Sequence, residues 1–255
     1  MGLRIVLLGP PGSGKGTLAE QLQKRLALFH LSTGDLFRRQ IGRKTALGRA
    51  VRHYVAEGLL VPDELVVEVM TRRLSRRVLQ RGFVLDGFPR TVGQAQGLDR
   101  FLRSRRRPLD GAVALPCLPA VLIRRLSGRR VCERCGTIYH VRNMPPKRQD
   151  MCDRCGGRLV IRQDDRVVTI KKRLHVDRAQ AKPLLAYYRR QGILYRVNGN
   201  GSSEQVFARA VRLFTRQGWL KSVSPLSRLS RFSPLSGKRA KRAQRANGND
   251  RAQNP

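Results

Sequence analysis

Short apolar runs alternate with longer segments of helical spacing along the first half of the chain. Residues Leu3–Leu8 are almost continuously aliphatic and are followed by glycine and proline, which is typical of a central strand buried on both faces. Leu18, Leu22 and Leu26 then recur every four residues, so a helix is predicted over about residues 14–28.

The same alternation continues through most of the chain. Further strands are predicted at residues 82–85, 112–115 and 193–197. Further helices are predicted at residues 34–57, 62–79, from about 91, 167–190 and 203–217. Strands and helices that alternate at these lengths indicate a parallel sheet flanked by helices, which is the α/β class.

Two segments interrupt this pattern. Residues 128–165 are rich in cysteine, glycine and proline, and we expect them to be an insertion with its own fold. From residue 221 to 255 the chain becomes rich in serine, proline, lysine and arginine, with nine basic residues and the single acidic residue Asp250. We expect this basic tail to be disordered.

Composition bounds the classes of protein that remain. With 255 residues and 40% hydrophobic content, the chain can bury one main domain with insertions. No apolar run approaches the ~20 residues of a membrane-spanning helix, and the N-terminus lacks the features of a signal peptide. We therefore expect a soluble, cytoplasmic protein.

The charge of the chain is strongly positive. Its 53 lysines and arginines against 17 acidic residues give a net charge of +36, and residues 1–220 alone keep 44 against 16, a net of +28. Such a field attracts polyanions of any kind, so nucleotides, nucleic acid and acidic membranes all remain candidate partners.

Four of the five cysteines form two Cys-x-x-Cys pairs. Cys132 and Cys135 are separated by sixteen residues from Cys152 and Cys155, a spacing typical of a structural zinc site closed by four thiolates. The remaining Cys117 has leucine neighbours, and we expect it to be a small buried hydrophobic residue.

A glycine-rich loop follows the first predicted strand. Residues Gly9–Lys15 read G-x-x-x-x-G-K, the spacing of a loop whose backbone N–H groups hold phosphate oxygens at a helix N-terminus while the lysine reaches the β and γ phosphates. Gly16 stands where the general motif has serine or threonine, and Thr17 follows it. The hydroxyl group that contacts magnesium in the general motif is therefore missing at position 16.

Three ordered segments make the resemblance specific. Gly9–Thr17, Leu31–Asp35 and Leu85–Thr91 are similar to the three signature segments of the adenylate kinase family, and the resemblance covers residues 1 to about 218. It implies a five-stranded, P-loop NTPase-like parallel sheet flanked by helices, with reversible phosphoryl transfer from MgATP to AMP giving two ADP. It also implies the domain organisation: a core of residues 1–31, 62–127 and 166–220, a helical AMP-binding insertion at 32–61 and a zinc lid at 128–165.

The resemblance also implies the site residues, with ATP, AMP and ADP as the ligands of a monomer. The expected ATP-binding residues are Gly12, Ser13, Gly14, Lys15, Gly16, Thr17, Arg125, Arg129, Ile138, Tyr139 and Gly201. The expected AMP-binding residues are Thr33, Arg38, Leu59, Leu60, Val61, Gly87, Phe88, Pro89, Arg90, Gln94, Arg162 and Arg173. The expected catalytic residues are Lys15, Arg90, Arg129, Arg162 and Arg173. Asp86 is expected to orient Mg²⁺ through water, and Cys132, Cys135, Cys152 and Cys155 to hold Zn²⁺.

Two other functions remain open at this point. A kinase for another nucleoside monophosphate could use the same scaffold, although such enzymes resemble this chain with a much shorter lid. A nucleic-acid-binding protein could instead use the cysteine segment and the basic surface or tail. Aromatic residues make up only 5% of the chain, which argues against a base-stacking surface.

Overall fold

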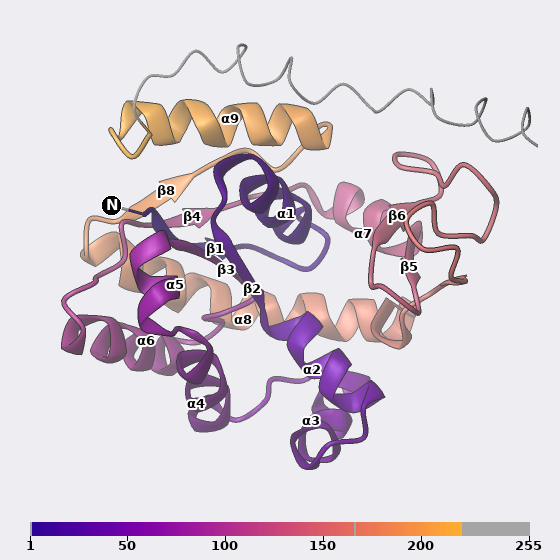
Figure 1. Ribbon diagram of the computed structural model, residues 1–255, viewed down its shortest axis with the longest axis horizontal. Coiled ribbons are helices and arrows are strands. Elements are labelled where there is room, and N and C mark those ends of the chain that lie inside the picture. The colour runs from indigo at the N-terminus through magenta and orange to yellow at the C-terminus, as the bar shows by residue number, and fades with distance from the viewer. Residues whose placement is uncertain (1, 166, 221–255) are drawn as a thin grey trace, which may run out of the picture. The chain divides into compact units, whose positions relative to one another are not determined.

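The computed structural model describes residues 2–165 and 167–220 (Figure 1). The segment predicted to be a disordered basic tail, residues 221–255, lies outside the described residues. No helix in the described part of the chain is long and apolar enough to cross a membrane.

A five-stranded parallel sheet forms the centre of the structure and confirms the predicted fold class. Its strand order is β2-β3-β1-β4-β8, and all four neighbouring pairs run parallel. The strands are β1 (Arg4–Leu8), β2 (Phe29–Ser32), β3 (Phe83–Asp86), β4 (Gly111–Ala114) and β8 (Leu194–Arg196). The central strand β1 is buried along its whole length, as its continuous aliphatic run predicts.

Nine helices of the described residues follow or flank these strands. They are α1 (Lys15–Leu26), α2 (Thr33–Gly42), α3 (Ala46–Glu57), α4 (Asp63–Arg73), α5 (Arg76–Arg81), α6 (Val92–Ser104), α7 (Pro119–Ser127), α8 (Val167–Arg190) and α9 (Ser203–Arg216). The main core lies between the sheet and these helices and includes large, fully buried side chains such as Phe83, Phe88 and Tyr188.

Two of the segments with helical spacing each contain two helices in the structure. The segment 34–57 divides before α3, where the Thr45 hydroxyl accepts a hydrogen bond from the Gly48 N–H at 3.0 Å. The segment 62–79 divides before α5, where Ser75 caps the new helix by accepting from the Val78 N–H at 3.4 Å. Both segments are helical, as their spacing predicts, but the spacing did not show the breaks, because a hydroxyl side chain inside an apolar pattern begins a new helix.

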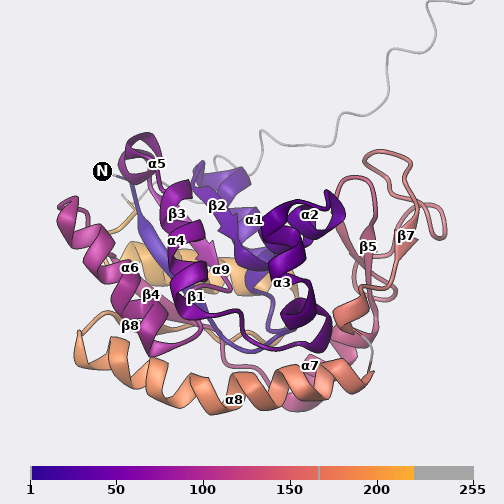
Figure 2. The same ribbon diagram turned by 90° about the horizontal axis from the view of Figure 1, so that it is seen from below.

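The cysteine-rich segment forms a second, smaller sheet. Strands β5 (Arg129–Cys132), β6 (Ile138–His140) and β7 (Leu159–Val160) pair antiparallel in the order β6-β5-β7, and a short 3₁₀ helix, η1 (Gln163–Asp165), follows them. Figure 2 shows this sheet at one side of α7 and at one end of α8. We call residues 128–165 the lid segment.

Parallel strands give the main sheet two chemically different edges. The carboxyl ends of all five strands lie at one edge, and the amino ends lie at the other. In both views α5 and α6 lie at one side, and the lid strands lie at the opposite side (Figures 1 and 2). We refer to these as the amino edge and the carboxyl edge.

Candidate active site

The loop between β1 and α1 has a backbone that only glycine adopts readily. Gly12 and Gly14 have φ angles of 84° and 97°, in the left-handed region that disfavours other residues. A Cβ atom at Gly12 would also lie 2.9 Å from the side chain of Leu126. The loop ends at the N-terminus of α1, where unsatisfied N–H groups and the helix dipole stabilise an anion.

Two side chains of this loop have donors that a phosphate could accept from: the partly buried Lys15 and the buried Ser13. The Lys15 ammonium group donates to the backbone oxygens of Gly9 and Pro10, the latter at 2.9 Å. Burial lowers the pKa of Lys15, and the nearby Asp86 carboxylate offsets only part of that effect. The Ser13 hydroxyl is fully buried and has no hydrogen-bond partner among the described residues. Oxygen acceptors of a bound phosphate would satisfy both groups.

A cavity of about 720 Å³ borders this loop. All the predicted ATP-binding residues line it, namely Gly12, Ser13, Gly14, Lys15, Gly16, Thr17, Arg125, Arg129, Ile138, Tyr139 and Gly201. Its lining includes residues of the glycine-rich loop Gly9–Lys15 (the P-loop), of α7, of the small sheet in the lid segment and of the loop after β8. The volume is within the range of small-molecule sites.

Arg125 holds two walls of this cavity together. Its guanidinium group donates to the carbonyl oxygens of Ser13 at 3.3 Å, Gly199 at 3.0 Å and Gly201 at 2.7 Å. Arg125 therefore links the P-loop to the loop after β8 and fixes their spacing. The sequence placed this arginine at the site but could not show that its donors bind backbone carbonyls.

A second, smaller cavity of about 70 Å³ lies next to the first. The predicted AMP-binding residues that line it are Thr33, Arg38, Leu59, Leu60, Val61, Gly87, Arg90, Gln94 and Arg173. Thr33 donates to the Gly87 carbonyl at 2.8 Å, and Arg90 donates to the same oxygen through Nε at 3.0 Å. Three predicted AMP-binding residues lie elsewhere: Pro89 and Arg162 line the larger cavity, and Phe88 lines neither.

Phe88 is the one predicted AMP-binding residue that lines neither cavity. Its side chain is fully buried and belongs to the main hydrophobic core. The side chain therefore supports the cavity wall from behind, and a ligand contact of Phe88 stays a prediction. The signature segment placed it beside true lining residues, but the direction of a side chain depends on the packing of the sheet.

Gln94 is held by partners that the sequence did not reveal. Its Oε1 accepts from the Arg90 N–H at 2.8 Å, and its Nε2 donates to Asp63 Oδ1 at 2.9 Å. Asp63 also accepts from the Thr91 hydroxyl at 2.6 Å. These bonds fix the orientation of the amide and leave one Nε2 hydrogen for a ligand. Asp63 looked like an ordinary residue at a helix start, so no signal identified it.

Two aspartates at the end of the lid segment neutralise arginines of the larger cavity. Asp165 accepts from Arg129 Nε at 2.6 Å and lies 3.3 Å from Arg173 Nη1. Asp164 lies 3.0 Å from the same Arg173 nitrogen. Both aspartates are buried, so the pairs are shielded from solvent. Their adjacency was visible in the sequence, but their partners were not.

Asp35 provides a third counter-charge. It lies 2.7 Å from Arg38 Nη2 and 3.7 Å from Arg162 Nη2. Burial, and then the positive charges of Arg38 and Arg129, lower the pKa of Arg162 to about 10. The buried Nε of Arg162 has no hydrogen-bond partner among the described residues. This arginine therefore retains a donor for an anionic ligand.

Asp86 ends β3 directly beside the P-loop. A Cβ atom built on Gly16 would lie 3.2 Å from Asp86 Oδ2. A side chain at position 16 would therefore require the Asp86 carboxylate to shift by a few tenths of an ångström. Asp86 lines the larger cavity, and an oxygen ligand at that place suits Mg²⁺ held through water.

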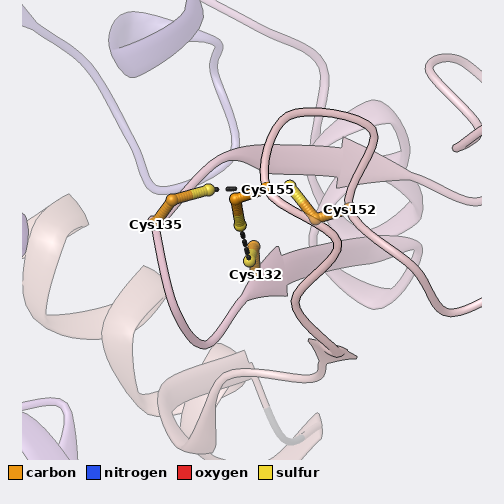
Figure 3. Close-up of side chains that lie close together, drawn as sticks. All are labelled: Cys132, Cys135, Cys152 and Cys155. Carbon is orange, nitrogen blue, oxygen red and sulfur yellow. Dashed lines mark hydrogen bonds between the residues drawn. The ribbon is translucent and has the colours of Figure 1, made fainter.

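The four paired cysteines converge in the lid segment (Figure 3). All four Sγ atoms lie within 4.8 Å of one another, with Cys132 and Cys155 3.4 Å apart and Cys135 and Cys152 3.5 Å apart. Zinc–sulfur bonds of ~2.3 Å in a tetrahedron need sulfurs about 3.8 Å apart. The cluster can therefore hold a metal ion of this kind with little movement.

Cys117 does not have the environment that the sequence suggested. It is partly exposed rather than buried, and its Sγ lies 3.1 Å from Asn200 Oδ1. The prediction of a buried hydrophobic residue was wrong because Cys117 follows the end of β4, where the chain leaves the sheet.

Comparison with known proteins agrees with this geometry. The sequence profile of the family described as adenylate kinase matches residues 7–193. An adenylate kinase of Thermoanaerobacter sp. (strain X514) is 44% identical over 205 residues, covering 80% of this chain and 94% of that protein. One from Carboxydothermus hydrogenoformans is 45% identical over 206 residues, covering 81% and 96%. One from Clostridium botulinum (strain Langeland) is 44% identical over 214 residues, covering 84% and 99%.

The match to the family profile spans the glycine-rich loop Gly9–Lys15, the lid segment, the whole lining of the smaller cavity and most of the lining of the larger one, so the likeness includes the functional parts and not the sheet alone. The chain therefore belongs to the adenylate kinase family, and its four-cysteine lid segment fits the bacterial type that carries a metal-binding lid.

Proposed function

We propose that this nucleoside monophosphate kinase transfers the γ-phosphoryl group of MgATP to AMP, reversibly, and produces two ADP. One observation carries the proposal above the others: the two cavities share a wall. Gly34, Arg38, Gly87, Arg90 and Arg173 line both of them. A phosphate group at this shared wall would be reachable from either side, as direct transfer between two nucleotides requires.

The reaction needs little covalent chemistry from the protein. An oxygen of the AMP phosphate attacks the γ-phosphorus, and the bond from that phosphorus to the β-phosphate oxygen breaks, leaving ADP on each side. The attacking phosphate is already an anion at neutral pH, so no general base is needed. The task of the protein is to position the groups and to stabilise charge on the transferring phosphoryl.

The arginines at the shared wall suit this task. Guanidinium groups bind phosphate oxygens through paired donors and keep their charge. In the structure Arg38 and Arg173 are balanced by Asp35, Asp164 and Asp165. We infer that phosphate groups replace part of these carboxylate contacts when the nucleotides bind, and that closure of the lid segment excludes water from the γ-phosphate.

Two metal ions belong to the proposal. Asp86 would orient Mg²⁺ through water, and the ion would neutralise charge on the ATP phosphates. Zn²⁺ would be held by Cys132, Cys135, Cys152 and Cys155 in a structural role, because four thiolates leave no position for substrate. Zinc would allow a segment with a very small core to fold as a rigid body.

The choice of acceptor is tested by comparing nucleoside monophosphates. The purified protein is given ATP with AMP, UMP, CMP or GMP, and formation of each diphosphate is measured at equal concentrations. We expect AMP to be the preferred acceptor by a wide margin. Faster turnover with UMP or CMP would favour the other nucleoside monophosphate kinases, against which the long lid segment argues. The monomeric state and the cytoplasmic location stay predictions.

A further inference from the structure

Basic side chains gather at the amino edge of the main sheet, on the side away from both cavities. Each segment that leads into strands β2, β3, β4 and β8 contributes to this group, and all its members are exposed. Its members are Lys24, Arg76, Arg77, Arg81, Arg100, Arg103, Arg105, Arg106, Arg189 and Arg190. We call this group the amino-edge face. Figures 1 and 2 show α5 and α6, which carry half of its members, opposite the lid strands.

This face has almost no acidic residue to balance it. The segments 22–28, 75–82, 100–110 and 187–193 contain one acid, Asp110, and that carboxylate is bound to Arg4 Nη2 at 2.8 Å. Among the residues that the structure describes, no member of the amino-edge face forms an ion pair. Its charge therefore remains available to an external partner.

Local helix stabilisation does not account for the whole group. Basic residues in a last turn, such as Arg81 and Arg103, interact favourably with the helix dipole. Arg76 and Arg77, however, occupy the first turn of α5, where a positive charge is unfavourable. Arg106 comes directly after the C-cap of α6, where Arg103 and Arg105 already supply positive charge to the end of this helix. These side chains carry charge that the fold itself does not use.

The chemistry of the face favours a phosphodiester chain over other polyanions. All members but one are arginines, whose planar donors match phosphate oxygens. Of the exposed large apolar side chains in the described residues, only Phe29 lies at this edge. The face therefore lacks the apolar centre of a stable protein interface and the apolar residues that anchor an interfacial helix in a membrane.

We propose that the amino-edge face binds the phosphate backbone of nucleic acid, RNA or DNA, without reading the base sequence. Contacts from four separate segments along one edge suit a ligand with regularly repeated negative charges. Because the face lies at the opposite edge of the sheet from both cavities, nucleic acid and mononucleotides bind the protein at the same time. The proposal does not depend on the identity of the phosphoryl acceptor.

The test uses the full chain and two variants with the same change in net charge. In the face variant, Arg76→Gln, Arg77→Gln, Arg103→Gln and Arg106→Gln are combined. The control variant combines four substitutions of exposed arginines on or beside α2 and α3, Arg39→Gln, Arg43→Gln, Arg49→Gln and Arg52→Gln. Binding of a fluorescent single-stranded RNA is measured by anisotropy over a series of salt concentrations.

We expect the face variant to bind RNA at least about ten-fold more weakly at low salt, with a salt slope reduced by ~0.7 for each phosphate that the variant no longer neutralises. Its kinase rate should match the unmodified protein. The control variant should bind less than about three-fold more weakly, since general steering by net charge is the only effect it shares with the face variant. Saturating ATP and AMP should not displace the RNA.

Three results would overturn the proposal. If the two variants bind the RNA with equal affinity, binding depends on total charge or on residues 221–255, which both variants retain. Displacement of the RNA by ATP and AMP would place it in the cavities. Vesicles containing anionic phosphatidylglycerol provide a second probe: loss of vesicle binding in the face variant, with RNA binding unchanged, would indicate a membrane surface instead.

Discussion

At the carboxyl edge of the main sheet Arg129 and Arg173 are largely buried and lie against Asp165, whose side chain is fully buried. At the amino edge Arg76 and Arg77 are exposed, and neither forms an ion pair with the described residues. Arginine side chains are therefore buried and paired with carboxylates at the carboxyl edge, whereas those of Arg76 and Arg77 at the amino edge are exposed and have no such pair in the described residues. Buried arginines need carboxylates until a ligand arrives, because an unpaired buried charge is costly, whereas exposed arginines are solvated.

This contrast indicates how the positive charge of the chain is divided. The arginines at the carboxyl edge serve the two nucleotide cavities and are held in place by Asp35, Asp164 and Asp165. Two bound nucleotides cannot account for the charge at the other edge. Substitutions at the two edges are therefore expected to change stability and kinase rate by different amounts.

The largest effect is expected from removing a buried counter-charge. Asp165→Asn leaves Arg129 and Arg173 facing each other with less compensation, and removal of one partner of a buried pair typically costs about 3–5 kcal/mol. The free energy of unfolding is measured by urea denaturation. The matched control is Glu204→Gln, because Glu204 pairs with Arg25 at the surface and such pairs contribute at most about 1 kcal/mol. Similar destabilisation of both variants would contradict the contrast between the edges.

A comparable effect, on rate rather than stability, is expected at the shared wall of the cavities. Arg90→Ala should lower kcat by about 10²- to 10³-fold, the usual result of removing one preorganised donor from a developing charge. Arg103→Ala, at the amino edge, should leave the rate within about two-fold, since the substitution is remote from both cavities. Steady-state assays with ATP and AMP measure both, and circular dichroism checks the fold. Near-normal turnover in Arg90→Ala would count against the proposed function.

A smaller effect is expected from the metal site that orders the carboxyl-edge lid. Chelation should lower the melting temperature by about 4 °C or more, because metal binding contributes to folding. The combined variant Cys132→Ser and Cys152→Ser should melt as the chelated protein does, and chelation should not affect it further. Cys117→Ser is the control, since Cys117 lies outside the cluster. Unchanged melting after complete metal removal would show that the cysteines do not hold a structural ion.

The smallest effect is expected from acid pH. Burial alone would raise the pKa of Asp164, but the charges of Arg173 and Arg38 outweigh it, so the pKa lies below its ordinary value. A carboxyl group with a depressed folded pKa contributes stability above its unfolded pKa of about 3.9 and loses it as the pH falls through the folded value. The stability of Asp164→Asn should therefore fall less steeply on acidification below about pH 4 than that of the unmodified protein. Parallel curves, measured by urea denaturation at each pH, would contradict this.

Local patterns in the sequence predicted most of the fold. The aliphatic run of β1 followed by Gly9–Lys15 required a strand, a glycine loop and a helix in that order, and the structure has them. The five-stranded sheet came from the family resemblance, however, since β2 gave no periodic signal. This outermost strand of the sheet has only four residues and begins with the exposed Phe29. The helix α7 was also missed, although Pro119 at its start and Gly128 at its end are typical boundary residues.

The candidate site could be predicted as a set of residues but not as a network. Arg38, Arg129 and Arg173 were identified by their place in recognisable segments. Their pairing with Asp35, Asp164 and Asp165 could not be, because residues up to 126 positions apart are brought within 3.5 Å only by the folded chain. The hydrogen bond by which Asp63 orients Gln94 could not be predicted for the same reason, since the two residues are 31 positions apart.

By itself, the sequence determined the phosphate loop, the four-cysteine cluster, the family and the excess of positive charge. These depend on the type and spacing of nearby residues. The tertiary structure alone decided how that charge is distributed. Folding brings arginines of α2, the lid segment and α8 against carboxylates at the carboxyl edge and leaves another set exposed at the amino edge. No local pattern distinguishes the two sets.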